Sequence, residues 1–178
     1  MDGALRGRGV SDVSVRILDP STELSRLRDI RLESLRENPE AFSADLEMEE
    51  AMTPQDWVAR SKRGITFGGF RGDSLEGIVV FSQPQSRKTA HTGEVGAMYV
   101  RQAARGTGLA DAMMTALIAH AGGKVEQLRL GVNAENPRAV KFYERHGFRA
   151  VGRVPRYIRI GGRVFDELIM VRPVSTSD

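Results

Sequence analysis

The chain has 178 residues, of which 40% are hydrophobic and 28% are charged, and its formal net charge is +3. This composition is ordinary for a globular protein, and the length suits one domain with a full core rather than two. The sequence has no cysteine, which excludes disulfides, thiolate metal sites and a catalytic cysteine, and no run approaches the roughly 20 apolar residues of a membrane span.

Glycine and arginine dominate the first residues, which predict a disordered tail over 1–11. Alternating apolar side chains at 13–18 then predict a first strand. A helix is expected after this strand, with Ser21 or Thr22 as its N-cap and with its end near Glu37, before an Asn-Pro pair.

Two arginines of this helix share a face with its leucines. At about 100° per residue, Arg28 and Arg31 fall on the same broad arc as Leu27 and Leu32. In one interpretation each arginine stem packs while its guanidinium group reaches solvent. In the other interpretation one of the two arginines lines a cleft and binds a substrate carboxylate. Arg28 and Arg31 are therefore the candidate substrate-binding residues.

The next part of the chain predicts a second helix and a hairpin. Residues 39–52 are acidic and only weakly periodic, and they predict no regular element. Thr53-Pro54 is typical of a helix start, and this short helix is expected to end near Lys62. Residues 65–70 and 75–81 predict two antiparallel strands joined by a tight turn.

A strand at 92–100 leads into a glycine turn and a helix. The turn runs from Arg105 to Gly108, and the apolar residues after it recur at helical spacing until Gly122-Gly123. The first N–H groups of a helix lack intrahelical partners, and the macrodipole places positive charge there, so the turn predicts an anion site. Gly106 and Gly108 would let a phosphate approach the backbone, and Arg105 adds a permanent charge. A tight turn without a ligand is the alternative.

The rest of the chain predicts a strand, a short helix and a final hairpin. The strand spans 125–132, and the helix begins at Asn136-Pro137 and ends at Gly147, where a left-handed residue is expected. The hairpin pairs 148–160 with 163–171. The resulting order, β-α-α-β-β-β-α-β-α-β-β, indicates an α/β fold with a mixed sheet.

Two motifs resemble those of a known family. Arg105, Gly108 and Ala110 form the pattern Arg-x-x-Gly-x-Ala, which resembles the acetyl-CoA motif (Gln/Arg-x-x-Gly-x-Gly/Ala) of the GNAT superfamily of N-acetyltransferases. The segment 136–148 is similar to that family's Asn-x-x-Ala-x-x-x-Tyr-Glu-x-x-Gly-Phe signature. The resemblance covers 13–172, and it implies the GNAT fold: a mixed, mostly antiparallel seven-stranded sheet flanked by about four helices.

The resemblance implies acetyl-CoA as co-substrate, with no metal. The turn and the start of its helix would hold the pyrophosphate, through Arg105, Gly106, Thr107, Gly108, Leu109 and Ala110. In the family the preceding strand is bulged, and its exposed amides pair with the pantetheine and polarise the acetyl carbonyl. Carried over, these are the backbones of Met98, Tyr99 and Val100, and Gly96 is compatible with a bulge.

Four further residues complete the expected site. Asn136 would hydrogen-bond the pantetheine or acetyl region, although it could equally be an N-cap, and Asn133 is a second cofactor candidate. Tyr143 is the candidate general acid, because a phenol of pKa about 10 can protonate a departing thiolate whose acid has pKa about 8.5. Packing within its helix is the alternative for Tyr143. Glu94 is the candidate base, since on a regular strand it shares a face with Met98; a cross-strand ion pair is the alternative.

The predicted function is acetyl transfer from acetyl-CoA to a primary amine of a small molecule, by direct attack. Acetylation of a protein N-terminus or lysine is one alternative, and a non-catalytic acyl-CoA-binding sensor is another. Because the basic residues are spread along the chain, no nucleic-acid partner is expected. We also expect no membrane partner, a cytoplasmic location, and a monomer or homodimer. Residues 12–174 are expected to form one domain, followed by a tail at 175–178.

Overall fold

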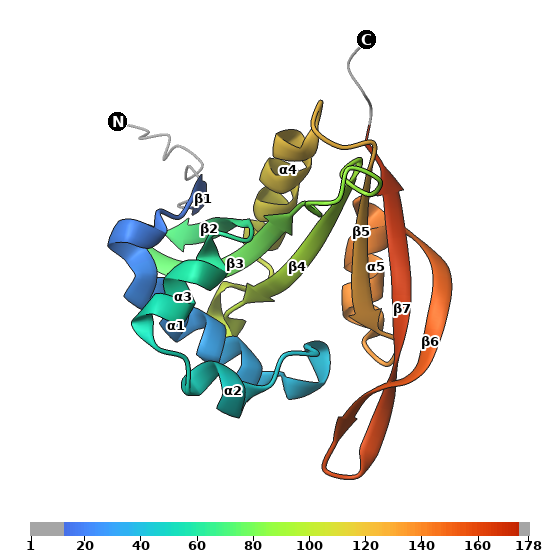
Figure 1. Cartoon of the computed structure of the whole chain (residues 1–178), viewed down its shortest axis with the longest axis horizontal. Coiled ribbons are helices and arrows are strands. Elements are labelled where there is room, and N and C mark those ends of the chain that lie inside the picture. The colour runs from blue at the N-terminus through green and yellow to red at the C-terminus, as the bar shows by residue number, and fades with distance from the viewer. Residues whose placement is uncertain (1–12, 175–178) are drawn as a thin grey trace, which may run out of the picture.

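The computed structural model describes residues 13–174, and the tails predicted at 1–11 and 175–178 lie outside these residues. Seven strands form one sheet in the order β1-β2-β3-β4-β5-β7-β6 (Figure 1). The strands are β1 Val13–Ile17, β2 Ile65–Arg71, β3 Ser74–Ser82, β4 Thr92–Val100, β5 Gln127–Asn133, β6 Arg149–Ile160 and β7 Arg163–Pro173. The helices are α1 Pro20–Glu37, α2 Leu46–Glu50, α3 Pro54–Ser61, α4 Leu109–Ala121 and α5 Pro137–Arg145, with 3₁₀ turns η1 Pro39–Ala41 and η2 Gln102–Ala104.

The pairing of the strands confirms the predicted sheet. Five of its six neighbouring pairs are antiparallel, and β4 and β5 form the parallel pair. The parallel connection from β4 to β5 passes through α4, as a crossover between parallel strands requires. The sheet is therefore mixed and mostly antiparallel, and each predicted strand lies within a few residues of its observed position.

Two predictions about helices were wrong. The N-cap of α1 is Asp19, whose carboxylate accepts a hydrogen bond from the Ser21 N–H at 2.8 Å. The cap lies earlier than expected because Pro20 already occupies the first helical turn, where its missing N–H costs nothing. The chain also forms α2, capped by Asp45, which accepts from the Met48 N–H at 3.0 Å. Residues 13–174 thus contain five α-helices, in agreement with a sheet flanked by about four.

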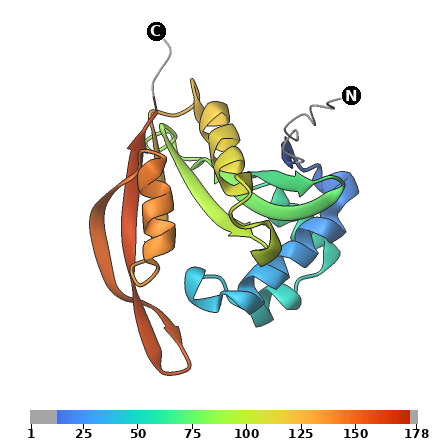
Figure 2. The same ribbon diagram turned by 180° about the vertical axis from the view of Figure 1, so that it is seen from behind.

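Helices cover both faces of the sheet. Figure 1 shows α1, α2 and α3 on one face, and Figure 2, seen from behind, shows α4 and α5 on the other. One core lies under α4 and includes Val79, Leu109 and Met113, and a second lies under α1 and includes Ile78 and Trp57. Ile78 and Val79 are neighbours on β3, so alternate side chains of this strand enter different cores. A strand buried on both faces is an almost continuous apolar run, which explains the sequence of β3.

The sheet opens between β4 and β5. These strands pair only at their first residues, where Thr92 to Glu94 lie opposite Gln127 to Arg129. Further along, β4 contains a bulge, because Ile78 pairs with Tyr99 and Val80 with Gly96, so that two residues of β4 stand opposite one of β3. Ala97, the first of these two residues, has a φ of 51°. The bulge expected in this strand is therefore present, and beyond it the edge of β4 that faces β5 has no strand partner among the described residues.

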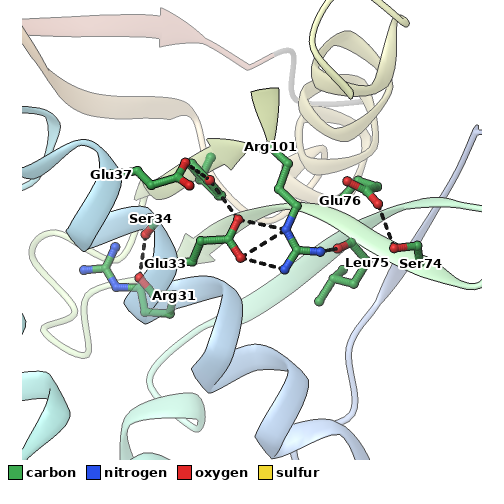
Figure 3. Close-up of polar contacts among 9 residues, drawn as sticks. Arg31, Glu33, Ser34, Glu37, Ser74, Leu75, Glu76 and Arg101 are labelled. Carbon is green, nitrogen blue, oxygen red and sulfur yellow. Dashed lines mark hydrogen bonds and ion pairs between the residues drawn. The ribbon is translucent and has the colours of Figure 1, made fainter. Parts of the chain in front are cut away.

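Polar contacts with α1 fix the end of β4 on one side of this opening (Figure 3). The buried Tyr99 hydroxyl donates toward Glu37 at 2.7 Å and toward Glu33 at 3.0 Å. Arg101 donates to both Glu33 oxygens, at 2.6 and 2.8 Å, and to the Leu75 carbonyl at 2.9 Å. Hydrogen bonds from Arg101 lower the pKa of Glu33, which keeps this carboxylate charged. The end of β4 is thereby held against α1 rather than against β5.

Candidate active site

Three neighbouring cavities lie beside β4, and the middle one occupies the opening between β4 and β5. The turn cavity, of about 520 Å³, lies between the glycine turn and α5. The central cavity, of about 280 Å³, lies between the β4 bulge and β5, and shares Phe42, Met98 and Asn136 with the turn cavity. The arginine cavity, of about 310 Å³, lies between α1, α3 and β3, and shares Arg31 and Ala97 with the central cavity. The shared residues place the three cavities next to one another in a row, which we call the cavity path.

The glycine turn shapes the wall of the turn cavity as the sequence predicted. Gly106 and Gly108 have φ angles of 80° and 86°, in the left-handed region that favours glycine. A Cβ at either position would meet no atom within 4 Å, so the backbone is open to a ligand. The backbone hydrogen bonds of α4 begin with the Ala112 N–H, which donates to Gly108 at 2.9 Å. The amides before Ala112 are therefore free of helical partners and can bind an anion.

Several predicted cofactor residues have side chains that are engaged within the protein, and two of them, Thr107 and Leu109, do not line the turn cavity. The Leu109 side chain is fully buried in the core beneath α4. The Thr107 hydroxyl donates to the Ala104 carbonyl at 2.7 Å, which stabilises the turn itself. Tyr99 and Val100 are buried as well, and the Tyr99 hydroxyl is committed to α1. Only the backbones of these residues are available to a ligand.

Three cations surround the same cavity. Arg105, Arg138 and Arg145 line it, together with one carboxylate, that of Asp111. Asp111 is already engaged, since its carboxylate lies 2.9 Å from His146 Nε2. Arg138 and Arg145 were not predicted from the sequence, although their spacing of seven residues places both on one face of α5. The cavity therefore combines free amides with a surplus of positive charge, which suits a pyrophosphate.

Tyr143 and the two predicted asparagines line the central cavity. Tyr143 is buried, and this burial raises the pKa of its phenol. Asn136 is the N-cap of α5, since its side chain accepts from the Ala139 N–H at 3.0 Å. Asn133 is also occupied within the protein: its Nδ2 donates to the Glu40 carbonyl at 3.0 Å, and its Oδ1 accepts from the Glu135 N–H at 2.8 Å. Asn133 thus fixes η1 beside β5, and its amide is already in use.

The two acidic residues nearest the opening differ in position. Glu94, the predicted base, is exposed, accepts from Arg129 Nη1 at 3.5 Å, and lines none of the three cavities. The bulge lies between Glu94 and Met98, so the regular alternation behind that prediction does not hold. Glu167, which the sequence analysis missed, lines the central cavity. A Cβ at Gly131 would overlap the Glu167 carboxylate, so a glycine there makes room for it.

Partial burial makes the Glu167 carboxyl group a weaker acid than an exposed glutamate. Removal from solvent raises the pKa of its carboxyl, and Arg129 opposes this shift. One sequence signal could have indicated the residue: Glu167 shares strand parity with the buried Phe165, so its carboxylate is at an inward position. A carboxylate and a phenol, both desolvated, therefore line one small cavity. Such a pair can accept and donate protons around a bound ligand.

Arg31 and Arg28, the predicted substrate-binding residues, are separated by the structure. Arg31 is buried and lines both the central and the arginine cavity. Arg28 is half-buried and lines none of the three cavities. Two further arginines that the sequence analysis missed, Arg60 and Arg63, line the arginine cavity. Within residues 13–174, no group of three or more His, Cys, Asp or Glu could hold a metal ion, and no described helix is long and apolar enough to cross a membrane.

Comparison with known proteins gives one family and many similar folds. The model of the acetyltransferase (GNAT) family matches residues 25–148, from α1 to the end of α5. Comparison of the sequence with curated proteins gives no match.

Three of the similar solved structures illustrate the range. An acetyltransferase of the GNAT family from Streptococcus pneumoniae has a TM-score of 0.78 and 23% identity, over 91% of this chain and 99% of that one. A Salmonella typhimurium protein solved with its cofactor acetyl-CoA has a TM-score of 0.74 and 17% identity, over 92% and 95%. A ribosomal-protein-alanine N-acetyltransferase from Brucella melitensis has a TM-score of 0.73 and 22% identity, over 90% and 99%. At these identities the likeness establishes a common fold.

Proposed function

Since this chain belongs to the acetyltransferase (GNAT) family, we propose that it transfers an acetyl group from acetyl-CoA to a primary amine of a small molecule. The observation that carries this proposal is the path of three cavities, with Tyr143 and Glu167 in the middle one. One end of the path is suited to a pyrophosphate and the other end is large enough for a small acceptor. The two ligands would then meet in the central cavity.

The residues of the turn cavity fit the cofactor. Free amides from Gly106 to Ala110, together with Arg105, Arg138 and Arg145, would hold the pyrophosphate. The edge of β4 after Glu94 has no strand partner, so the amide groups of the pantetheine can pair with it as an added strand would. The backbone at the bulge, next to Met98, would polarise the acetyl carbonyl.

The reaction is an exchange of one acyl bond and requires two proton transfers. Acetyl-CoA supplies an acetyl group activated as a thioester; the acceptor nitrogen forms the amide bond while the carbon–sulfur bond breaks. The ammonium of the acceptor loses two protons in total, and one proton reaches the thiolate sulfur. With no cysteine in the chain to carry the acetyl group, the amine attacks directly.

Tyr143 is the proposed general acid. Its raised pKa keeps the phenol protonated, and thus able to donate, across the whole physiological pH range. The same desolvation raises the basicity of a thiolate in this cavity, so the proton can pass from the phenol to sulfur. Packing contacts with Phe142 and Phe148 hold the ring in place.

Glu167 is the proposed general base. Its carboxylate lines the same cavity as Tyr143, and a raised pKa makes it a stronger proton acceptor. Glu94 remains the rival candidate, since a carboxylate at the far end of the same sheet face could act through water. Glutamine variants of both residues distinguish the two.

The proposal is tested by incubating the protein with acetyl-CoA and a broad panel of amines while following free thiol. The protein contributes no thiol background, because it has no cysteine. We expect Tyr143→Phe to lower kcat by about 100-fold or more while the Kd for acetyl-CoA changes less than about threefold. Tyr157→Phe, an exposed tyrosine on β6, is the matched control and should keep full activity.

Other outcomes would favour the alternatives. Thiol release only with peptides would indicate a protein N-terminal or lysine acetyltransferase. No release with any amine, together with a melting temperature raised by acetyl-CoA, would indicate an acyl-CoA-binding sensor. Unchanged kcat in Tyr143→Phe would refute the role of this tyrosine.

A further inference from the structure

One buried arginine in the wall of the arginine cavity has an unused donor. Arg31 is 5% exposed, and its Nε and Nη2 donate to the two oxygens of Glu49, each at 3.0 Å. Its Nη1 is buried and has no hydrogen-bond partner within residues 13–174. An unsatisfied charged donor is costly to bury, so such a group calls for an explanation. Its place on a residue that lines two cavities suggests a ligand.

The charges around Arg31 do not balance. Glu49 is shared, because Arg60 Nη2 lies 3.0 Å from the same Oε1 that Arg31 contacts. Arg63 adds a third cation to the lining of the cavity, and no aspartate or glutamate is among the lining residues. Burial lowers the pKa of Arg60, and the neighbouring Arg31 and Arg63 lower it further while Glu49 opposes them. This wall therefore carries a surplus of positive charge that an anion would neutralise.

Arg31 is also held in a fixed position. Its guanidinium group lies 5.0 Å from the ring of Phe42, and the Ser34 hydroxyl donates to its carbonyl at 2.7 Å. Arg101, a half-buried arginine that also contacts α1, has its Nε and both Nη groups engaged by Glu33 and Leu75. Figure 3 shows the guanidinium group of Arg31 pointing away from the Arg101 network. A preorganised donor without a partner is the form that a binding site takes.

We propose that the arginine cavity binds an anionic group of the acceptor, so that the substrate is a small amine bearing a carboxylate, such as an α-amino acid. This inference rests on the proposed acetyl transfer. Arg31 and Ala97 line both the arginine and the central cavity, so a carboxylate bound to Arg31 leaves the adjacent amine at the boundary between them. Tyr143 and Glu167 line the far side of that boundary. A polyamine or amino sugar brings only positive charge, which three arginines repel.

The first test needs no variant. Thiol release is measured for α-amino acids, each matched with its carboxamide, which keeps the amine and side chain but removes the negative charge. We expect kcat/KM to be about 10- to 100-fold higher for the amino acids. Equal rates for acid and amide would refute the anion site and leave the proposed function intact. Thiol release from neither, nor from any other amine, would refute the proposed function.

A binding measurement distinguishes a failure of the anion site from a failure of the proposed acetyl transfer. Trp57 is the single tryptophan of the chain, and its ring lies 5.8 Å from the Arg60 guanidinium carbon. Its fluorescence, titrated with an amino acid and with the matched carboxamide in the absence of acetyl-CoA, should change saturably with the acid alone. A preference for the acid without turnover would support the anion site and refute catalysis. Identical titrations by acid and amide would refute the anion site.

Matched variants test whether Arg31 is the residue that causes the preference for the amino acid over its carboxamide. Arg31→Met should remove the preference for acid over amide, whereas Arg31→Lys should restore part of it. Arg36→Met is the control: Arg36 also joins α1 to the α2 region, through an exposed pair with Glu50 at 2.7 Å, and it lines none of the three cavities. If Arg31→Met does not fold, Arg60→Met, at a half-buried position, should reduce the preference severalfold. A preference that survives in a folded arginine variant would contradict the inference.

Discussion

The two ends of the cavity path present charge in different ways. The turn cavity uses backbone amides and exposed arginines, and the amides come from one short segment, 106–110. The arginine cavity uses buried side chains that already pair with one another: Arg31 from α1, Glu49 from α2 and Arg60 from α3. Amides at a helix start need only a local turn, whereas a buried ion pair needs three helices packed in register. A binding site built from one short segment leaves a sequence motif, whereas a site built from three separate helices does not.

The exposed and the buried arginines also differ in how they affect stability. Exposed arginines contribute little to stability and are screened by salt. Buried arginines carry a large desolvation cost that only well-placed partners offset. The proposed acceptor end is thus expected to be stiff and selective, whereas the proposed cofactor end is open and is expected to depend on long-range attraction. Four experiments test this contrast.

The largest effect is expected in the central cavity, which lies between the turn cavity and the arginine cavity. Glu167→Gln should lower kcat by about 100-fold or more, whereas Glu94→Gln should lower it less than about threefold. A base must be unprotonated to accept a proton, so kcat/KM should rise with pH through the raised pKa of Glu167. That step should vanish in Glu167→Gln. A full loss in Glu94→Gln instead would make Glu94 the base and place the acceptor amine outside the central cavity.

A large loss of stability is expected at the acceptor end. Glu49→Gln leaves Arg31 and Arg60 without their carboxylate, and should reduce the free energy of unfolding by about 3–5 kcal/mol. Glu50→Gln changes the next residue, whose pair with Arg36 is exposed, and should cost about 0–1 kcal/mol. Urea denaturation followed by circular dichroism measures both. Similar losses would mean that the arginine cavity does not depend on its buried pair.

A smaller effect is expected at the cofactor end. Gly108→Ala places a Cβ on a residue with φ of 86°, which costs roughly 1–2 kcal/mol, and should weaken acetyl-CoA binding about 5- to 30-fold as the turn relaxes. Gly123→Ala is the matched control, because Gly123 has φ of 71° and equally open surroundings beyond the other end of α4. Both variants should melt earlier, and calorimetry should show weaker binding in Gly108→Ala alone. Equal affinities would remove the turn from the cofactor site.

Added salt should produce the smallest change. It should affect the KM values of the two substrates differently, so it distinguishes the turn cavity from the arginine cavity without a mutation. Raising KCl from about 0.05 M to about 0.5 M should increase the KM for acetyl-CoA about three- to fivefold, since exposed arginines are screened. The KM for an amino-acid acceptor should change less than about twofold, because Arg31 is buried. The reverse order of sensitivities would break the comparison.

The sequence predicted much of the fold and about half of the site. Regular alternation, helical periodicity and turn residues placed the strands and most helices. The glycine turn was readable because Gly106 and Gly108 adopt positive φ angles that few other residues accept. Arg138 and Arg145 were not predicted, because the sequence does not distinguish single exposed arginines on a helix from ordinary solvated residues.

Two residues show where reasoning from short segments reaches its limit. Glu94 was related to Met98 by strand alternation, and one extra residue at the bulge broke that relation. Glu167 lies on the last strand, and only the sheet order, which places β7 beside β5, brings it to the cavity that Tyr143 also lines. Neither the bulge position nor the strand order is a property of a short segment.

By itself, the sequence determined what depends on neighbours along the chain: the glycine turn, the helix that follows it, and the capped helix that carries Tyr143. Tertiary structure alone decided which side chains meet. It parted β4 from β5, placed Glu167 in the cavity rather than Glu94, and left one donor of Arg31 unpaired. Backbone geometry is set within a few residues, whereas burial, desolvation and charge pairing depend on segments far apart in sequence.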